Sequence, residues 1–233
     1  MRKFLIGCSA AALLLLWGCG GSKETSEAPK KEEAPAAAPA AAVSDADAAT
    51  VTGKVAFTGD KPAMKNISMD ATPACARAHT TPQKSQEVVV NDNGTLRNVF
   101  VWVKSGLPDK QWPKPDKVRL DQKGCMYIPH VTAMMVGQQL LIKNSDPFLH
   151  NIHALSQINP AFNKAQNGKN DGEKFDSPKA PENFHVKCDV HPWMSCFVAI
   201  FDHPYFSVSG DDGRFNIKVK GNNALSKDLN MDR

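Results

Sequence analysis

Two short segments of the chain contain side chains that could together bind one soft metal ion. Cys188, His191 and Met194 follow one another at intervals of three residues, so a single tight loop can present a thiolate, an imidazole and a thioether. The segment 144–153, NSDPFLHNIH, supplies further imidazoles. Sulfur ligands favour Cu(I), and imidazoles bind both Cu(I) and Cu(II). The set therefore predicts a mononuclear copper site that transfers single electrons.

Each of these side chains could instead have a purely structural role. Cys188 could be a buried free thiol, Met194 a core residue, and the histidines ordinary loop residues. Their joint spacing favours the metal site over this alternative. A ligand set without carboxylates argues against calcium or magnesium, whereas zinc could bind to one Cys and two His. We expect two neighbouring imidazoles, His153 and His185, to be strand residues and not ligands.

Short β-strands are the elements that must position these residues. Residues 138–143 form a nearly continuous apolar run that leads into the first segment. Residues 183–187 precede the second segment and residues 197–201 follow it. Runs of this kind are bounded by Gly, Asn, Asp and Pro, and no segment has the periodicity of an amphipathic helix. The pattern predicts an all-β sandwich in one domain over residues 51–220.

Further strand signals lie outside these runs. Residues 51–57 alternate between apolar and polar side chains and lead into a Gly-Asp-Lys-Pro turn. Residues 87–104 predict a hairpin around an Asn/Gly turn, and residues 205–217 predict a second hairpin. Residues 156–182 are rich in Asn, Lys, Gly and Pro, so we expect a long surface excursion with one short strand.

The two ligand segments resemble the metal-binding loops of amicyanin-like cupredoxins. That family pairs an Asn-x-x-x-x-x-His-Asn-x-His segment with a Cys-x-x-His-Pro-Phe-Met loop. This chain has residues 144–153 in the place of the first and CDVHPWM, residues 188–194, in the place of the second. The resemblance extends from about residue 136 to 202 and is strongest in the two loops. It implies a cupredoxin-like Greek-key β-sandwich with a type 1 (blue) copper site.

The resemblance also implies roles for individual residues. Asn151 would hydrogen-bond across to the loop of the ligand cysteine and brace it. His191 would be the route by which electrons enter and leave, through an exposed histidine edge. Phe148, Pro192 and Trp193 would form an apolar rim around that edge, suited to brief docking of a partner. The ligands of the one copper ion would be His150, Cys188, His191 and Met194.

The chain differs from small cupredoxins in three respects. A longer insertion separates His150 from Cys188, and residues 51–130 add strands that the small proteins lack. The hairpin predicted at residues 205–217 is also additional. We therefore expect an all-β, cupredoxin-like Greek-key β-sandwich with added N-terminal strands and a C-terminal hairpin.

Four of the six cysteines fall within the predicted folded part. An exported protein meets an oxidising compartment, so Cys75 and Cys125 are predicted to form a disulfide that contributes about 4 kcal/mol in the chain-entropy model. The alternative is that they form a second metal site with His79 and His130. Cys196 would remain as a buried thiol.

The N-terminus predicts export and a lipid anchor. Residues 1–18 contain a basic start and a short apolar run, and the sequence LWGC that ends at Cys19 resembles a bacterial lipobox. Cys19 would then be lipidated, although an ordinary signal peptide or a retained anchor stays possible. Residues 19–50 are poor in large apolar side chains and predict a disordered tether. Residues 221–233 predict a polar tail.

The formal net charge is +4, and the basic residues form no run of Lys or Arg. This distribution argues against nucleic-acid binding. The expected protein is a monomeric electron carrier, not an enzyme, tethered to a bacterial membrane at the periplasmic face of the outer membrane. Its partner would be a redox protein such as a c-type cytochrome or a periplasmic oxidoreductase. Two alternatives stay open: copper storage, delivery or sensing, and an adhesion or scaffold module that binds no metal.

Overall fold

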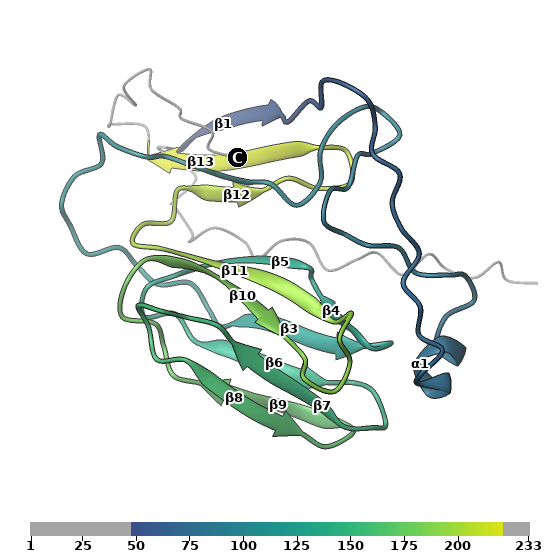
Figure 1. The fold of residues 1–233 in the computed structure, drawn as a ribbon. Coiled ribbons are helices and arrows are strands. Elements are labelled where there is room, and N and C mark those ends of the chain that lie inside the picture. Colours follow the sequence, from purple (N-terminus) through teal and green to yellow (C-terminus); the bar gives the residue numbers. More distant parts are fainter. Residues whose placement is uncertain (1–47, 221–233) are drawn as a thin grey trace, which may run out of the picture. The chain divides into compact units, whose positions relative to one another are not determined.

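The computed structural model describes residues 48–220, and their fold is almost entirely β (Figure 1). The predicted signal peptide, residues 1–18, and the lipidation site Cys19 lie outside the described residues, as does the predicted tail, residues 221–233. Within the described part, no helix is long and apolar enough to cross a membrane.

Two β-sheets form a sandwich. The strand orders are β5–β11–β10–β7–β8 and β4–β3–β6–β9, and neighbours are antiparallel except for β5 with β11 and β3 with β6. The strands of the first sheet are β5 (Val131–Met135), β11 (Ser195–Phe201), β10 (Glu182–Lys187), β7 (His150–Ala154) and β8 (Phe162–Gln166). The strands of the second sheet are β4 (Met126–Ile128), β3 (Val118–Lys123), β6 (Leu140–Asn144) and β9 (Asn170–Phe175).

Apolar side chains from both sheets meet in one core. Leu120 and Ile142 from the four-stranded sheet, and Ile152, Val186 and Val198 from the five-stranded sheet, are at most 1% exposed. In β3 every second residue is buried, because side chains alternate between the two faces of a strand. Burial of each such side chain stabilises the fold by about 1.5–3 kcal/mol. The predicted all-β sandwich is confirmed.

Two further ladders are built from the segments that precede and follow the strands of the sandwich. β1 (Ala48–Lys54) pairs with β13 (Arg214–Lys220), and β2 (Phe100–Trp102) pairs with β12 (Phe206–Val208), both antiparallel. A cluster that includes Phe206 joins β12 to strands β5 and β11 of the sandwich. The ladders share an apolar cluster made of Val101, Val103, Tyr205, Phe215, Ile217 and Val219.

The pairing predicted for the two hairpins is wrong. β2 pairs with β12 and not with residues 87–90, where Val90 makes only an isolated bridge with Leu96. The C-terminal hairpin predicted at residues 205–217 is not a ladder, because β12 pairs with β2 and β13 pairs with β1. Alternating apolar residues predict that a segment is a strand, but they do not predict which other strand it pairs with. Here the pairing follows from an apolar cluster to which segments before and after the sandwich both contribute.

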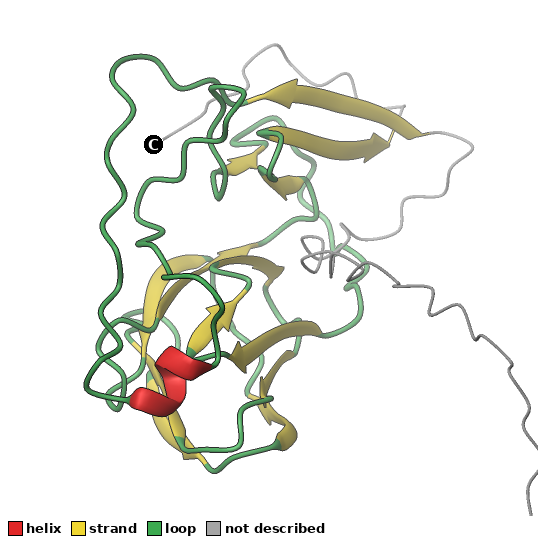
Figure 2. Cartoon of the chain, turned by 90° about the vertical axis from the view of Figure 1, so that its right-hand side faces the viewer, coloured by secondary structure: helices red, strands yellow, loops and turns green. Residues whose placement is uncertain are grey.

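Two smaller predictions also need correction, and one short helix was not predicted. β1 begins at Ala48, inside the tether predicted over residues 19–50, because its first residues pair with residues 218–220. α1 (Pro73–Arg77), which lies beside the sandwich (Figure 2), has only five residues and so shows no helical periodicity. Residues 156–182 contain β8 and β9 in place of one short strand, because three of the five residues of β8 are exposed and give no apolar alternation.

The carboxylate of Glu182, the first residue of β10, organises the turn before β8. It accepts hydrogen bonds from Ser156 Oγ (2.5 Å), from the N–H groups of Gln157 (2.5 Å), Ile158 (3.0 Å) and Asn159 (3.0 Å), and from Asn159 Nδ2 (2.9 Å). Burial raises the pKa of Glu182, but the hydrogen bonds favour the carboxylate more strongly and lower the pKa to about 2.

Glu182→Gln is expected to lower the free energy of unfolding by about 1 kcal/mol at neutral pH, a value kept small because the group is partly exposed. The pKa in the folded protein lies below the ordinary value of 4.5. The stabilisation is therefore present above about pH 4.5 and is lost as the pH falls toward 2. Urea unfolding at neutral pH and at about pH 3 measures the difference. Glu87→Gln, at an exposed residue, is the matched control, and equal stability of the two variants at neutral pH would contradict the prediction.

Candidate metal centre

The predicted ligands lie at the ends of neighbouring strands of the five-stranded sheet. His150 is the first residue of β7, and Cys188, His191 and Met194 lie in the loop from β10 to β11. Two backbone hydrogen bonds close this loop, from Cys188 N to Met194 O (3.1 Å) and from Met194 N to His191 O (2.9 Å). Because β10 lies between β7 and β11, the loop comes back beside His150.

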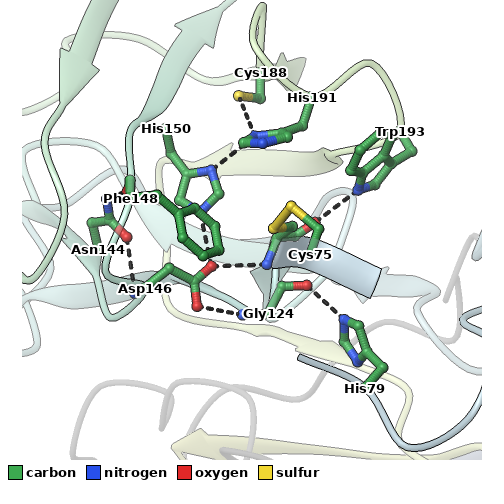
Figure 3. The surroundings of a disulfide bond; sticks show 11 residues. Cys75, His79, Gly124, Asn144, Asp146, Phe148, His150, Cys188, His191 and Trp193 are labelled. Atoms are coloured by element: carbon green, nitrogen blue, oxygen red, sulfur yellow. Dashed lines mark hydrogen bonds and ion pairs between the residues drawn. A yellow bond between two sulfur atoms is a disulfide. The ribbon is translucent and has the colours of Figure 1, made fainter. Parts of the chain in front are cut away.

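His150, Cys188 and His191 bring their ligand atoms together inside the protein (Figure 3). The two Nδ1 atoms of the histidines are 3.0 Å apart, and Cys188 Sγ lies 3.8 Å from His191 Nδ1. Nitrogens bound to one ion at about 2.0 Å lie roughly 3 Å from each other, so these three residues fit a single metal ion. Met194 is fully buried in the same loop, and its part as the fourth ligand stays a prediction.

The surroundings favour the metal-binding form of two ligands. Burial raises the pKa of the Cys188 thiol. Its hydrogen bond with His150 and those from the N–H groups of His191, Asn151 and Val190 outweigh burial and lower the pKa overall. Burial and the neighbouring His150 lower the pKa of His191. A thiolate and a neutral imidazole are the forms that bind metal, so the folded chain favours both.

Asp146 orients His150 through the ring nitrogen that faces away from the cluster. His150 Nε2 lies 2.8 Å from Asp146 Oδ2. The same carboxylate accepts hydrogen bonds from the N–H groups of Gly124 (2.7 Å) and Cys125 (2.8 Å), and Asn144 Oδ1 accepts from the N–H of Asp146 (3.0 Å). A carboxylate at Nε2 keeps the proton there and leaves Nδ1 free as a ligand.

The directions of the pKa shifts of Asp146 and His150 agree with a strong hydrogen bond between the two side chains. Burial lowers the pKa of His150, but its bonds to Asp146 and Cys188 raise it overall. Burial raises the pKa of Asp146, but the bonds from His150 and from two N–H groups lower it overall. Sequence reasoning missed Asp146, although it lies four residues before His150 within the first ligand segment and could have been noted there.

Asn151 connects the two ligand loops as the resemblance implied. Its Oδ1 accepts a hydrogen bond from the N–H of Asp189 (2.9 Å), next to Cys188. The hydroxyl of Tyr127 adds a second connection, because it donates to Asn151 O (2.5 Å) and lies 3.1 Å from Lys187 O. The buried Tyr127 side chain thus contacts the backbone next to His150 and the backbone next to Cys188.

The predicted docking residues surround His191, but the histidine itself is covered. The rings of Phe148 and Trp193 have centroids 6.3 Å and 5.3 Å from that of His191 and are partly buried, and Pro192 is exposed. His191 is only 3% exposed. The expected exposed histidine edge is therefore wrong, because the added N-terminal region packs against this end of the sandwich.

A disulfide is part of this cover. Cys75 in α1 and Cys125 in the turn between β3 and β4 are bonded, which is the pairing that the sequence predicted. Ligand atoms of Cys75, Cys125 and His191 all lie within 4.8 Å of one another. His79 and His130 each contact a backbone carbonyl instead, so neither is in the group of donors around these sulfurs.

The remaining candidates lie apart from the ligand cluster. Cys196 is a buried free thiol, as expected. His153 Nδ1 lies 3.0 Å from a carboxylate oxygen of Asp189, and the ring of His185 stacks on Phe197 with centroids 5.0 Å apart. These contacts agree with the prediction that both histidines are strand residues.

The sandwich carries the ligand cluster at one end, on one strand and on the loop between two others. The fold of the described residues is an all-β sandwich. No family model matches the chain, and no curated protein matches it. Similar solved structures include amicyanin from Paracoccus versutus, with 17% identity and a TM-score of 0.33 over 45% of this chain and 100% of that chain.

Two other similar structures come from different sources. A purple cupredoxin from Nitrosopumilus maritimus has 19% identity and a TM-score of 0.30 over 36% of this chain and 100% of its own. A Cu-containing nitrite reductase from Thermus scotoductus SA-01 has 18% identity and a TM-score of 0.35 over 41% of this chain. The match spans only 24% of the nitrite reductase chain.

Asp146→Asn is expected to weaken the binding of Cu(II) to the full chain by roughly 10- to 100-fold, because the carboxylate that orients a ligand histidine is lost. Calorimetric titration with Cu(II) measures the affinity. Asp109→Asn, at an exposed loop residue, is the matched control. If both variants bind Cu(II) as tightly as the unchanged protein, Asp146 does not orient a metal ligand.

Proposed function

We propose that this protein binds one copper ion through His150, Cys188, His191 and Met194 and carries single electrons between redox partners. The observation that supports this most strongly is the buried cluster of two Nδ1 atoms 3.0 Å apart beside a thiol with a lowered pKa. A bound copper ion would supply one-electron chemistry between Cu(I) and Cu(II), which thiolate and imidazole ligands together allow.

The surrounding residues would hold the ligands in one geometry. Asp146 fixes the ring of His150, and Asn151 joins the two ligand loops. Asn144 Nδ2 donates to the backbone oxygens of Phe148 (2.9 Å) and Asn167 (3.1 Å), which fastens the loop that leads to His150. Groups that are already oriented need little rearrangement when the charge at the centre changes by one unit.

The proposal includes a lipid anchor at Cys19 that would hold the protein at the periplasmic face of the outer membrane. Its support is the N-terminal sequence, with a basic start, an apolar run and LWGC. Lipidation with more than one acyl chain would make the anchor stable. The tether would let the folded part reach partners at some distance from the membrane.

The partner we propose is a redox protein such as a c-type cytochrome or a periplasmic oxidoreductase. Because His191 is covered, its docking surface would be the apolar side chains beside the ligand loops. Leu149 is 41% exposed and Val190 is 44% exposed, and Pro192 is exposed next to Trp193. Small apolar surfaces of this kind suit brief contacts between electron carriers.

One observation favours a second function, the storage or delivery of copper. The 3% exposure of His191 leaves little histidine edge for direct contact with a redox partner. The rate of electron exchange between reduced and oxidised protein separates the two functions. Fast exchange supports the carrier, whereas slow exchange with ready transfer of Cu(I) to a chelator supports storage or delivery.

Cys188→Ala is expected to abolish an intense visible absorption band that appears when the full chain is titrated with Cu(II). The band would come from charge transfer between the thiolate and copper, so it needs Cys188. Cys196→Ala is the matched control, because Cys196 is also a buried free thiol but lies outside the cluster. A band that is absent from the unchanged protein, or present in the Cys188 variant, would refute the proposed site.

A further inference from the structure

Two sulfur atoms lie next to the candidate metal centre and are not among its ligands. Cys75 and Cys125 are both 0% exposed, and their sulfurs and a ring nitrogen of His191 form a group within 4.8 Å (Figure 3). His191 Nδ1 already faces His150 Nδ1 (3.0 Å) and Cys188 Sγ (3.8 Å). The other ring nitrogen, His191 Nε2, makes neither of these two contacts.

The position of Cys125 does not depend on the disulfide alone. Gly124 and Cys125 both have positive φ (63° and 55°) and form the two-residue turn between β3 and β4. The Asp146 carboxylate accepts hydrogen bonds from the N–H groups of both turn residues, at 2.7 Å and 2.8 Å. Trp193 Nε1 donates to Cys125 O (3.1 Å) from the other ligand loop. The turn would therefore keep Cys125 beside His191 after the S–S bond is broken.

Cys75 is also held by contacts other than the disulfide. His79 Nε2 lies 2.6 Å from Gly124 O, so the segment after α1 is fastened to the same turn. Cys75 and Met69, which is 6% exposed, both belong to the core cluster of the sandwich. Three of the five residues of α1 are exposed, so Cys75 belongs to a surface element although it is itself buried.

We propose that Cys75, Cys125 and His191 form a second site, for a soft metal ion such as Cu(I), that exists only when the disulfide is reduced. A dithiol would supply two electrons and two protons and become a disulfide itself, while the bond between Cys75 and Cys125 breaks and leaves two thiols. Cu(I) then binds to both sulfurs, without a change in its oxidation state, and displaces the two thiol protons. Where the first ion already occupies His191 Nδ1, binding at Nε2 also displaces the proton of that nitrogen. Two thiolates and an imidazole are ligands that suit Cu(I).

The test counts the Cu(I) ions that the full chain binds before and after reduction with a dithiol, with the excess reductant removed under anaerobic conditions. Competition with a chromophoric Cu(I) chelator gives the number. We expect reduction to add about one equivalent of bound Cu(I). The added ion should protect Cys75 and Cys125 from alkylation, which mass spectrometry of their peptides detects.

Two variants test which residues bind the added Cu(I) ion. The Cys75→Ser/Cys125→Ser double variant keeps every other cysteine and is expected to lose the added equivalent. Cys188→Ala removes a ligand of the proposed electron-transfer centre and is expected to keep the added equivalent, so failure of the two proposals can be told apart.

Three results would overturn the second site. The first is an equal number of Cu(I) ions in the oxidised and reduced protein. The second is an added equivalent that persists in the double variant, because other cysteines would then bind it. The third is loss of the β-sheet circular dichroism signal on reduction, because the site needs the folded turn.

Discussion

The buried carboxylate of Asp146 connects parts of the chain that are far apart in sequence. One of its oxygens contacts both His150 Nε2 and the N–H of Cys125, and the other accepts the N–H of Gly124. A carboxylate that is 6% exposed would be costly without such partners. The carboxylate therefore links the turn between β3 and β4 to the loop before β7, and it orients a candidate metal ligand at the same time.

The same turn explains why the centre is closed to solvent. Cys125 is bonded to Cys75 in α1, and its carbonyl oxygen accepts a hydrogen bond from Trp193 in the second ligand loop. These contacts place the disulfide against His191, which is 3% exposed. A partner would meet apolar side chains such as Leu149 and not a histidine edge. Electron exchange and metal release would both depend on this cover.

Part of the site could be predicted because it is local in sequence. Cys188, His191 and Met194 lie within seven residues, and hydrogen bonds inside that loop bring them together, so their spacing alone indicates a common site. Alternation of apolar residues predicted strands such as β3, because a strand turns successive side chains to opposite faces. The pairing of Cys75 with Cys125 followed from the few cysteines in the predicted folded part.

The sequence by itself therefore determined the β character of the chain and the residues of the second ligand loop, since both depend on neighbours a few positions away. Only the tertiary structure decided that β13 pairs with β1, that Asp146 supports His150 through the β3–β4 turn, and that His191 is covered. Each of these involves contacts between segments far apart in the chain, and the side chains on one segment do not reveal which other segment will pack against them.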